Sequence, residues 1–329
     1  MRAGAASEAD MIRRIQQIAA DQANRRLILS IGDDAAAFRP RPGYLILVST
    51  DALVEGIHFD FKYCSADDVG WKALAVNLSD IAAMGGMPLY VTTSIALPRE
   101  VASSFVPRFY RGLTAIARQH GVTLIGGDTC RSPQGVFVDV TIVGEVEPRH
   151  LLTRKGAKPG DLIYVTGELG GSAAGMELLS RSRRAPVRSA VAKRHLRPLP
   201  RCSAARFLAQ RNLASAMIDL SDGLSTDLGH LCEHSGVGGI VEAARIPVAR
   251  TAGRHRELAD SPLHYALHGG EDYELLFTVP SQLSRRIPKE IGGVPAHKIG
   301  WITRSPGVWL VEGQEKRPLH PRGFAHFAR

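Results

Sequence analysis

Apolar runs of strand length alternate with segments of helix length along the chain, and this alternation restricts the fold more than any single motif does. In the first half the strand-like runs are YLILVST (44–50), LYVTTSIAL (89–97), VTLIGG (122–127) and VFVDVTIVGEV (136–146). The intervening segments predict helices over about 66–85 and about 101–120, the second ended by Gly121 as a C-cap. Strands mixed with helices in this way predict an α/β fold of the α+β type.

The second half has the same mixture, which predicts a second α/β domain. Its strand-like runs are LIYVTG (162–167), AMIDL (216–220), YELLFTVP (273–280), HKIGWIT (297–303) and GVWLVEG (307–313). A length of 329 residues is also long for a single core. The turn-rich, cationic stretch TRKGAKPGD (153–161) is the best boundary, so we predict domains over residues 1–150 and 151–329.

The chain lacks the sequence signals of a membrane or secreted protein. No apolar stretch approaches the ~20 residues that span a bilayer, so no membrane association is expected. The N-terminus has no continuous apolar segment; Ser7 and Asp10 instead predict the cap of a helix that carries Met11, Ile12, Ile15 and Ile18. The four cysteines are scattered, without a C-x-x-C pair, which favours free thiols in a reducing compartment. We therefore expect a cytoplasmic protein.

Basic charge is concentrated in one segment. The chain has 41 Lys and Arg against 32 Asp and Glu, a net charge of +9. No Asp or Glu lies between Glu177 and Asp219. The same stretch contains the basic residues Arg181, Arg183, Arg184, Arg188, Lys193, Arg194, Arg197, Arg201, Arg206 and Arg211. Such a segment could bind RNA, so an RNA-binding protein is one alternative. Because only Phe207 is available for base stacking, a solvated helical surface is favoured and no nucleic-acid partner is expected.

Aspartates follow the predicted strands in settings rich in Gly, Ser and Thr. They are Asp33 and Asp34 in SIGDDAAAF, Asp51 after Ser49 and Thr50 in LILVSTDALVEGIHF, Asp128 in TLIGGDTCRS, and Asp219 and Asp222 on either side of Ser221 in AMIDLSDG. Taken singly, each is explained as an N-cap or turn carboxylate. Their repetition at strand ends suggests a shared role.

Asp80 is harder to explain as a cap. It follows Val69, Ala73 and Val76 on one helical stripe, and a carboxylate on an inward stripe needs a partner. A buried hydrogen bond would serve. A metal would explain several such carboxylates together, and Mg²⁺ suits an oxygen-only set that leaves room for substrate phosphates. The chain has no P-loop and no protein-kinase signature, and the glycine-rich GELGGSAAG (167–175) is a weak phosphate signal that is more often a tight turn.

Eight blocks of the sequence together resemble thiamine-monophosphate kinases. In chain order they are IGDDAA, STDALVEGIHF, KALAVNLSDIAAMGGMP, LIGGDT, LTRKGAKPGDLIYVTGELGGSAAG, KRHLRPLPR, IDLSDGLSTDLGHL and GGEDYELLFTV, between about residues 30 and 280. The block NLSDIAAMG alone is typical of the wider superfamily of enzymes like aminoimidazole ribonucleotide synthetase. The pair STDALVEGIHF and GGEDYEL narrows the resemblance to the kinase family.

This resemblance implies a fold, a reaction and a set of site residues. The fold is a two-domain α/β fold like that of aminoimidazole ribonucleotide synthetase, in a homodimer whose N-terminal sheets join into a barrel. The reaction transfers the γ-phosphate of ATP to thiamine monophosphate with several Mg²⁺ ions. The implied metal ligands are Asp34, Ser49, Thr50, Asp51, Asp80, Asp128, Asp219 and Asp222. The implied ATP contacts are Tyr110, Gly127, Asp128, Arg154 and Ser221, and the implied thiamine contacts are His58, Glu271 and Phe324.

Phosphate chemistry agrees with the absence of a nucleophilic triad motif. A phosphate monoester has a second pKa of ~6, so the acceptor oxygen is already mostly ionised at neutral pH and needs no strong general base. Repulsion between two polyanions is the obstacle, and Mg²⁺ with a cation such as Arg154 would offset it. Direct in-line transfer, without a phosphoenzyme, is the expectation.

Several features leave alternatives open. His58 alone is explained as a turn residue, Glu271 as a turn carboxylate, and Tyr110 as a core residue at helical spacing with Phe109. The C-terminal motif of the family is Gly, then an aromatic residue (Tyr or Trp), then Asp, His and Phe. This chain has GFAHF (323–327) at that place, so Phe324 keeps an aromatic ring that can stack but has no polar donor. Another ATP-using synthetase of the same superfamily is the enzyme alternative.

Overall fold

The computed structural model describes residues 15, 17–18, 26–181, 190–250, 252 and 258–323. The chain divides into two compact units, the first comprising Met1–Ile81 with Met87–Pro148 and the second Ala82–Gly86 with Arg149–Arg329. Of the predicted N-terminal helix, Ile15, Gln17 and Ile18 are helical, whereas the proposed cap at Ser7 and Asp10 lies outside the described residues.

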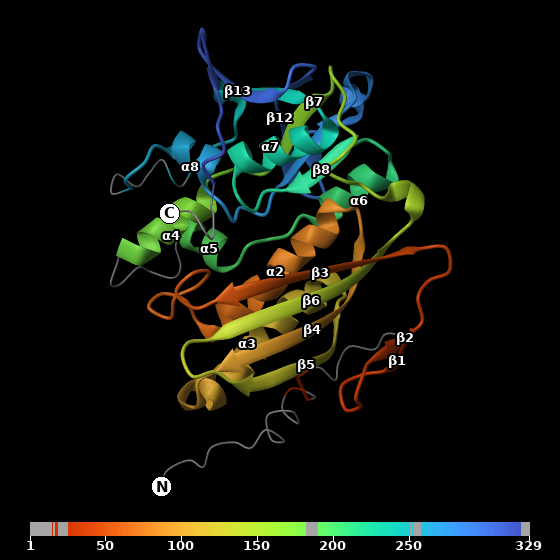
Figure 1. Cartoon of the computed structure of the whole chain (residues 1–329), viewed down its shortest axis with the longest axis vertical. Coiled ribbons are helices and arrows are strands. Elements are labelled where there is room, and N and C mark those ends of the chain that lie inside the picture. Colours follow the sequence, from red (N-terminus) through yellow and green to blue (C-terminus); the bar gives the residue numbers. More distant parts are fainter. Residues whose placement is uncertain are drawn as a thin grey trace. The chain divides into compact units, whose positions relative to one another are not determined.

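A four-stranded sheet organises the first unit, in the order β3-β6-β4-β5. Its strands are β3 (Leu45–Val54), β4 (Met87–Leu97), β5 (Thr123–Arg131) and β6 (Phe137–Val146), and only β4 and β5 pair in parallel. Helices α2 (Ala66–Ala83) and α3 (Arg99–His120) lie on one face of this sheet (Figure 1). Gly121 ends α3 in the left-handed conformation, with φ of 66°. The four strands and two helices predicted for this half are confirmed.

The two faces of this sheet differ in exposure. Side chains on the helix-covered face, including Val91, Val138 and Val140, are buried. The opposite face, which we call the open face, carries Ile46, Val48 and Thr50 of β3 and Phe137, Asp139 and Thr141 of β6. Val48 is 66% exposed, and Ile46 and Phe137 are 42% and 40% exposed. A small ribbon of β1 (Leu27–Leu29) and β2 (Ala37–Phe38) packs Phe38 against Tyr90 of β4.

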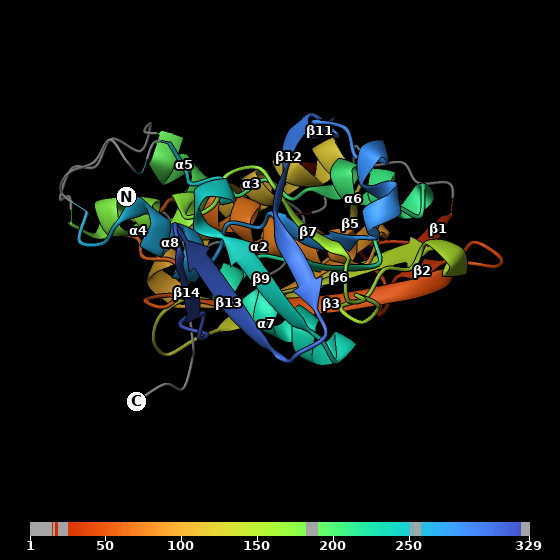
Figure 2. The same cartoon turned by 90° about the horizontal axis from the view of Figure 1, so that it is seen from above.

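The second unit is built on an eight-stranded sheet that is almost entirely antiparallel. Its order is β14-β13-β9-β12-β7-β10-β8, with β11 paired to β12, and only β13 and β9 are parallel. The strands are β7 (Leu162–Thr166), β8 (Ala216–Asp219), β9 (Gly238–Glu242), β10 (Leu275–Val279), β11 (Glu290–Ile291), β12 (Val294–Thr303), β13 (Gly307–Glu312) and β14 (Glu315–Pro318). Figure 2 shows β9, β12 and β13 side by side.

Five helices accompany this sheet in the part of the unit that the structure describes. They are α4 (Gly171–Arg181), α5 (Ala190–Leu196), α6 (Cys202–Gln210), α7 (Leu224–Ser235) and α8 (Pro262–His268). Helix α7 packs Leu228 and Leu231 into one core with Ile163 of β7 and Ile218 of β8. This core fixes the end of β8, where Asp219 lies, against the start of α7.

Two further predictions can be compared with the described residues. All four cysteines are free thiols, as predicted; Cys64, Cys202 and Cys232 are buried and Cys130 is exposed. Burial raises the pKa of the Cys202 and Cys232 thiols to about 12. Within the described ranges, no helix combines the length and the apolar character needed to cross a membrane.

Candidate active site

Ser49 and Asp80 form the clearest contact among the residues predicted to bind metal. Ser49, on the helix-covered face of β3, donates its hydroxyl to Asp80 Oδ2 of α2 at 2.5 Å. Asp80 is only half-buried, although the helical stripe predicted an inward position. The stripe misleads here because α2 is buried almost all round, so helical spacing does not single out one inward face. A hydroxyl and a carboxylate oxygen nevertheless lie side by side between strand and helix.

Thr50 points away from this pair. Its hydroxyl lies on the open face, 3.1 Å from Asp139 Oδ2 and 3.1 Å from Thr141 Oγ1. Strand alternation explains the separation, because successive side chains of β3 face opposite sides of the sheet. The sequence analysis did not select Asp139, although an aspartate inside the apolar strand VFVDVTIV was a visible signal.

The other predicted metal ligands of the first unit lie in separate local settings. Asp34 is exposed in a bend, and its backbone N–H donates to the side chain of Asp33. Asp51 is half-buried and pairs across the sheet with Val140. Asp128 is exposed, and its carboxylate accepts from the backbone N–H of Thr129. In the described part of the chain, no three His, Cys, Asp or Glu side chains converge closely enough to hold a metal ion by themselves. An ion here would need further ligands, as Mg²⁺ commonly takes from phosphates and water.

His58 closes a turn after β3. Its ring Nδ1 accepts the backbone N–H of Val54 at 3.0 Å, and its carbonyl oxygen accepts from Lys72 Nζ at 2.9 Å. Lys72 belongs to α2 and is almost fully buried, so it ties the turn to the helix. An accepting Nδ1 puts the hydrogen of the neutral ring on Nε2. His58 is thus the turn residue that the sequence allowed, and its ring presents a donor from a fixed position.

Gly127 and Tyr110 both lie close to Thr93 of β4. A Cβ on Gly127 would lie 2.3 Å from the carbonyl oxygen of Thr93, so only glycine fits at this position of β5. The hydroxyl of Tyr110 lies 2.7 Å from Thr93 Oγ1, and the side chain is buried. Burial, above all, raises the pKa of Tyr110. This is the core position that the spacing with Phe109 allowed.

In the second unit, Asp219 and Asp222 flank a tight turn between β8 and α7. Asp219 is buried at the end of β8, whereas Ser221 and Asp222 are half-buried. Asp227 reaches back from α7 and accepts the backbone N–H groups of Asp222 and Gly223 at 3.1 and 3.0 Å. Burial, and then the charges of Asp219 and Asp222, raise the pKa of Asp227 to about 8. Asp227 therefore caps the helix, and negative charge accumulates in this turn.

The GGEDYEL segment runs beside that turn. Backbone hydrogen bonds join Glu271 N–H to the Ser221 carbonyl at 2.7 Å and Tyr273 N–H to the Leu220 carbonyl at 2.9 Å. Glu271 and Tyr273 both have positive φ, 64° and 50°. Non-glycine residues rarely adopt this conformation, and they cluster at functional sites. The structure thus brings together Ser221 and Glu271, which the sequence assigned to different substrates.

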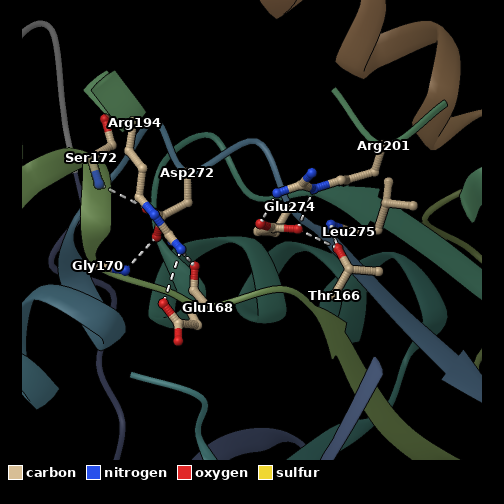
Figure 3. A network of polar contacts seen from close by, with 9 residues as sticks. All are labelled: Thr166, Glu168, Gly170, Ser172, Arg194, Arg201, Asp272, Glu274 and Leu275. Carbon is tan, nitrogen blue, oxygen red and sulfur yellow. Dashed lines mark hydrogen bonds and ion pairs between the residues drawn. The ribbon is translucent and has the colours of Figure 1, made fainter. Parts of the chain in front are cut away.

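Two carboxylates of the same segment anchor it to the glycine-rich turn after β7 (Figure 3). Asp272 accepts the backbone N–H groups of Gly170 and Ser172 at 2.6 and 3.1 Å. Glu274 accepts from Thr166 Oγ1 at 2.6 Å and forms a two-pronged ion pair with Arg201. The N–H groups of Gly170 and Ser172, which belong to GELGGSAAG, are thus occupied from within the chain, and this favours the tight-turn interpretation over a phosphate loop.

The remaining predicted residues lie at the surface or beyond the described ranges. Arg154 is exposed, and its guanidinium has no partner among the described residues. Phe324 lies outside those residues. In the basic segment, Arg194 is paired with Glu168 at 2.9 Å, Arg201 with Glu274, and Arg211 stacks 4.1 Å over the ring of Phe207. Part of the basic charge is therefore paired or stacked within the chain, which weakens the RNA-binding alternative.

Comparison with known proteins identifies the family. Residues 32–146 match the N-terminal domain of AIR synthase related proteins, and residues 158–311 match the C-terminal domain. The thiamine-monophosphate kinase of Escherichia coli strain K12 is 42% identical over 306 residues, covering 91% of this chain and 92% of that protein. The chain belongs to the thiamine-monophosphate kinase family. The Bacillus subtilis strain 168 member is 38% identical over 314 residues, covering 91% of this chain and 93% of its own.

Solved structures of the family share the fold. The thiamine-monophosphate kinase of Stenotrophomonas maltophilia K279a is 36% identical, with a TM-score of 0.82, and covers 91% of this chain and 95% of its own. The structure of AaThiL complexed with AMPPCP and TMP is 32% identical, with a TM-score of 0.77, and covers 99% of both chains. The hydrogenase maturation protein HypE, at 18% identity and a TM-score of 0.75, shares the fold alone. The predicted two-domain α/β fold of this superfamily is confirmed.

Proposed function

We propose that the chain transfers the γ-phosphoryl group of ATP to thiamine monophosphate and so forms thiamine diphosphate. The observation that carries the proposal is the likeness, over 99% of the chain, to a family member complexed with AMPPCP and TMP. Family membership at 42% identity over 91% of the chain supports it. The proposal assigns the nucleotide to Tyr110, Gly127, Asp128, Arg154 and Ser221, and the thiamine end to His58, Glu271 and Phe324.

The donor set fits magnesium. The residues proposed as ligands offer carboxylate and hydroxyl oxygens only: Asp34, Ser49, Thr50, Asp51, Asp80, Asp128, Asp219 and Asp222. Ser49 with Asp80 supplies such a pair at 2.5 Å, and Asp219 and Asp222 place two further carboxylates at the turn between β8 and α7. When bound, Mg²⁺ would offset charge on the transferring phosphoryl group. Thr50, on the open face, is the least well placed member of the set.

Direct transfer is proposed because the serine–histidine pairs in the described residues are not built as nucleophiles. Ser172 and the carboxylate of Glu271 both contact the same nitrogen of His195, Nδ1, at 3.3 and 3.1 Å. A nucleophilic triad needs the hydroxyl on one ring nitrogen and the carboxylate on the other. Ser225, 2.9 Å from His268 Nδ1, is fully buried. With an acceptor that is already ionised, the chain needs only to bind and align both substrates.

An assay of thiamine diphosphate formation from the monophosphate, ATP and Mg²⁺ tests the proposal. Replacing Asp51 with Asn should lower kcat/KM by roughly 10²-fold or more, the scale seen when one group that stabilises transition-state charge is removed. Asp260→Asn, at an exposed aspartate outside the proposed site, is the matched control and should leave activity unchanged. In the same preparation, γ-labelled ATP without acceptor should leave no label on the protein.

Two results would overturn parts of the proposal separately. Absence of thiamine diphosphate, with phosphorylation of a different acceptor, would remove the reaction. Stoichiometric protein labelling that can be chased onto thiamine monophosphate would keep the reaction and replace direct transfer by a two-step route.

We also propose that the chain forms a homodimer through the open face of the first unit. Val48, Ile46 and Phe137 expose apolar side chains on adjacent strands of one sheet face. Phe137 lies opposite Val54, toward the other end of β3 from Ile46 and Val48, so exposed apolar side chains occur at both ends of this face. Exposed apolar surface that a single chain leaves uncovered often marks an interaction site.

A further inference from the structure

The carboxylate of Glu271 lies beside a buried histidine of helix α5. His195 lies near the end of α5, and its side chain is 3% exposed, against 25% for that of Glu271. Its ring nitrogen Nδ1 lies 3.1 Å from Glu271 Oε2 and 3.3 Å from Ser172 Oγ. His195 comes from the block KRHLRPLPR, for which the sequence analysis found no role.

The chemistry of this contact assigns the hydrogen. A carboxylate oxygen at neutral pH only accepts, so the 3.1 Å contact is favourable when the ring carries hydrogen on Nδ1 and directs it at Glu271. A donor bonded to an ionised acceptor makes one of the stronger hydrogen bonds in proteins. A buried ring also has few alternative orientations, so it holds the carboxylate in one direction.

The backbone of Glu271 is held independently of its side chain. Asp272 binds the N–H groups of Gly170 and Ser172, and Tyr273 N–H binds the Leu220 carbonyl (Figure 3 shows the Asp272 contacts). These anchors fix where the side chain of Glu271 starts, at a residue with φ of 64°. They leave the direction of its carboxylate to be set by the groups that contact the carboxylate itself, and His195 is one of them.

We propose that His195 is a positioning residue for substrate recognition, which orients Glu271 toward the cationic, hydrogen-bonding thiamine end of the acceptor. The proposal rests on the role given above to Glu271. The proposal predicts that replacing His195 weakens the binding of thiamine monophosphate and does not change the binding of ATP. It also predicts that this effect of His195 depends on Glu271.

Variants of His195 separate positioning from packing. Leu fills a similar volume without a donor, whereas the side-chain NH₂ of Asn takes nearly the place of Nδ1–H. His195→Leu should raise the KM for thiamine monophosphate about tenfold, the scale of a lost hydrogen bond to a charged group, with the KM for ATP within about twofold. His195→Asn should restore the KM to within about threefold of wild type. His195→Gln, whose NH₂ moves toward the place of Nε2, should resemble Leu.

Glu271→Gln provides the reference. It should raise the KM for thiamine monophosphate, and adding His195→Leu to it should change that KM by less than about twofold, because coupled residues are not additive. Asp161→Asn is the stability control. Asp161 is a buried carboxylate that accepts from Lys158 N–H and Ser215 Oγ, before the start of β7 and away from the GGEDYEL segment. It should lower the thermal midpoint and leave both KM values unchanged.

The possible failures are distinguishable. If Glu271→Gln leaves the KM for thiamine monophosphate unchanged, the role of Glu271 in the proposed function is wrong, and the inference fails with it. If Glu271→Gln raises that KM and His195→Leu does not, the inference alone is overturned. Full additivity in the double variant, or equal defects of Asn and Leu, would also overturn it. Should the Leu variant fail to fold, the contrast between Asn and Gln decides.

Discussion

At the scale of single residues, buried carboxylates of the second unit hold segments that are distant in sequence. Glu274 is almost fully buried, accepts from Thr166 and pairs with Arg201 at the start of α6. It also explains why residue 167 is glycine: a Cβ there would lie 2.1 Å from Glu274 Oε1, and the residue has φ of 60°. The carboxylate of Glu274 thus requires a hydroxyl donor, a guanidinium partner and a residue without a Cβ at three positions of other segments.

Arg201→Met should therefore destabilise the protein strongly. Removing one partner of a buried ion pair leaves an uncompensated charge, at a cost of about 3 kcal/mol, the lower end of the usual range because Arg201 is partly exposed. Urea denaturation would measure the loss. Adding Glu274→Gln should recover part of it, because the stranded charge is then gone.

The matched control for this prediction is Arg245→Met. Arg245 pairs with Glu242 at 2.5 Å, but both side chains are substantially exposed, so the cost should stay below about 1 kcal/mol. Equal losses for the two arginine variants would contradict the argument from burial.

At the scale of elements, α4 begins on a carboxylate from a remote segment. Asp272 accepts two backbone N–H groups at the turn between β7 and α4, where a helix leaves such donors unsatisfied. Burial, above all, raises the pKa of Asp272 to about 7, against an ordinary value of about 3.9. The folded state therefore binds this proton more tightly than the unfolded state does.

The consequence is a pH-dependent cap. The contribution of Asp272 is complete below about pH 4 and is lost as the pH rises toward 7, where the folded protein must carry the buried charge. Asn resembles the protonated carboxyl and does not ionise. The unfolding free energy of wild type, relative to that of Asp272→Asn, should fall as the pH rises from 4 to 7. Urea midpoints at several pH values would measure this, and a constant difference would contradict it.

The sequence predicted elements better than contacts between elements. Runs such as VFVDVTIVGEV and the glycine after α3 specify strands and helix ends locally, and these predictions were confirmed. The contacts of Asp272, Glu274 and His195 join residues that are 23 to 108 positions apart, and no local pattern encodes such distances. The resemblance to the family identified Glu271 as a candidate thiamine contact, but it did not identify His195, whose ring lies beside the carboxylate of Glu271.

The sequence also does not show which face of the sheet each residue of β3 occupies. The alternation along β3 separates Thr50 from Ser49, but only the pairing with β6 and the position of α2 decide which of them meets Asp80. Grouping by motif put Ser49, Thr50 and Asp51 into one ligand set. The pleat of the strand puts Thr50 on the other face.

At the scale of the whole molecule, the open face of the first unit exposes apolar side chains that nothing in a single chain covers among the described residues. Val48 is 66% exposed between Ile46 and Thr50 on β3, which lies at the edge of its sheet. Exposed apolar strands at a sheet edge are prone to pair with another chain unless something covers them. A second copy covering this face would account for its composition.

Val48→Lys should therefore convert a dimer to a monomer. A lysine at position 48 would place a charge inside the proposed interface, where an unpaired charge is costly. Light scattering coupled to size exclusion should give a mass near two chains for wild type and near 35.6 kDa for the variant. Leu199→Lys, at a 53% exposed leucine of the second unit, is the matched control and should remain dimeric. A dimer that survives Val48→Lys, or a monomeric wild type, would exclude this face as the interface. If the dimer is confirmed, Thr50, Asp139 and Thr141 lie in its interior, where the hydrogen bonds of Thr50 to Asp139 and Thr141 satisfy polar groups that the interface buries.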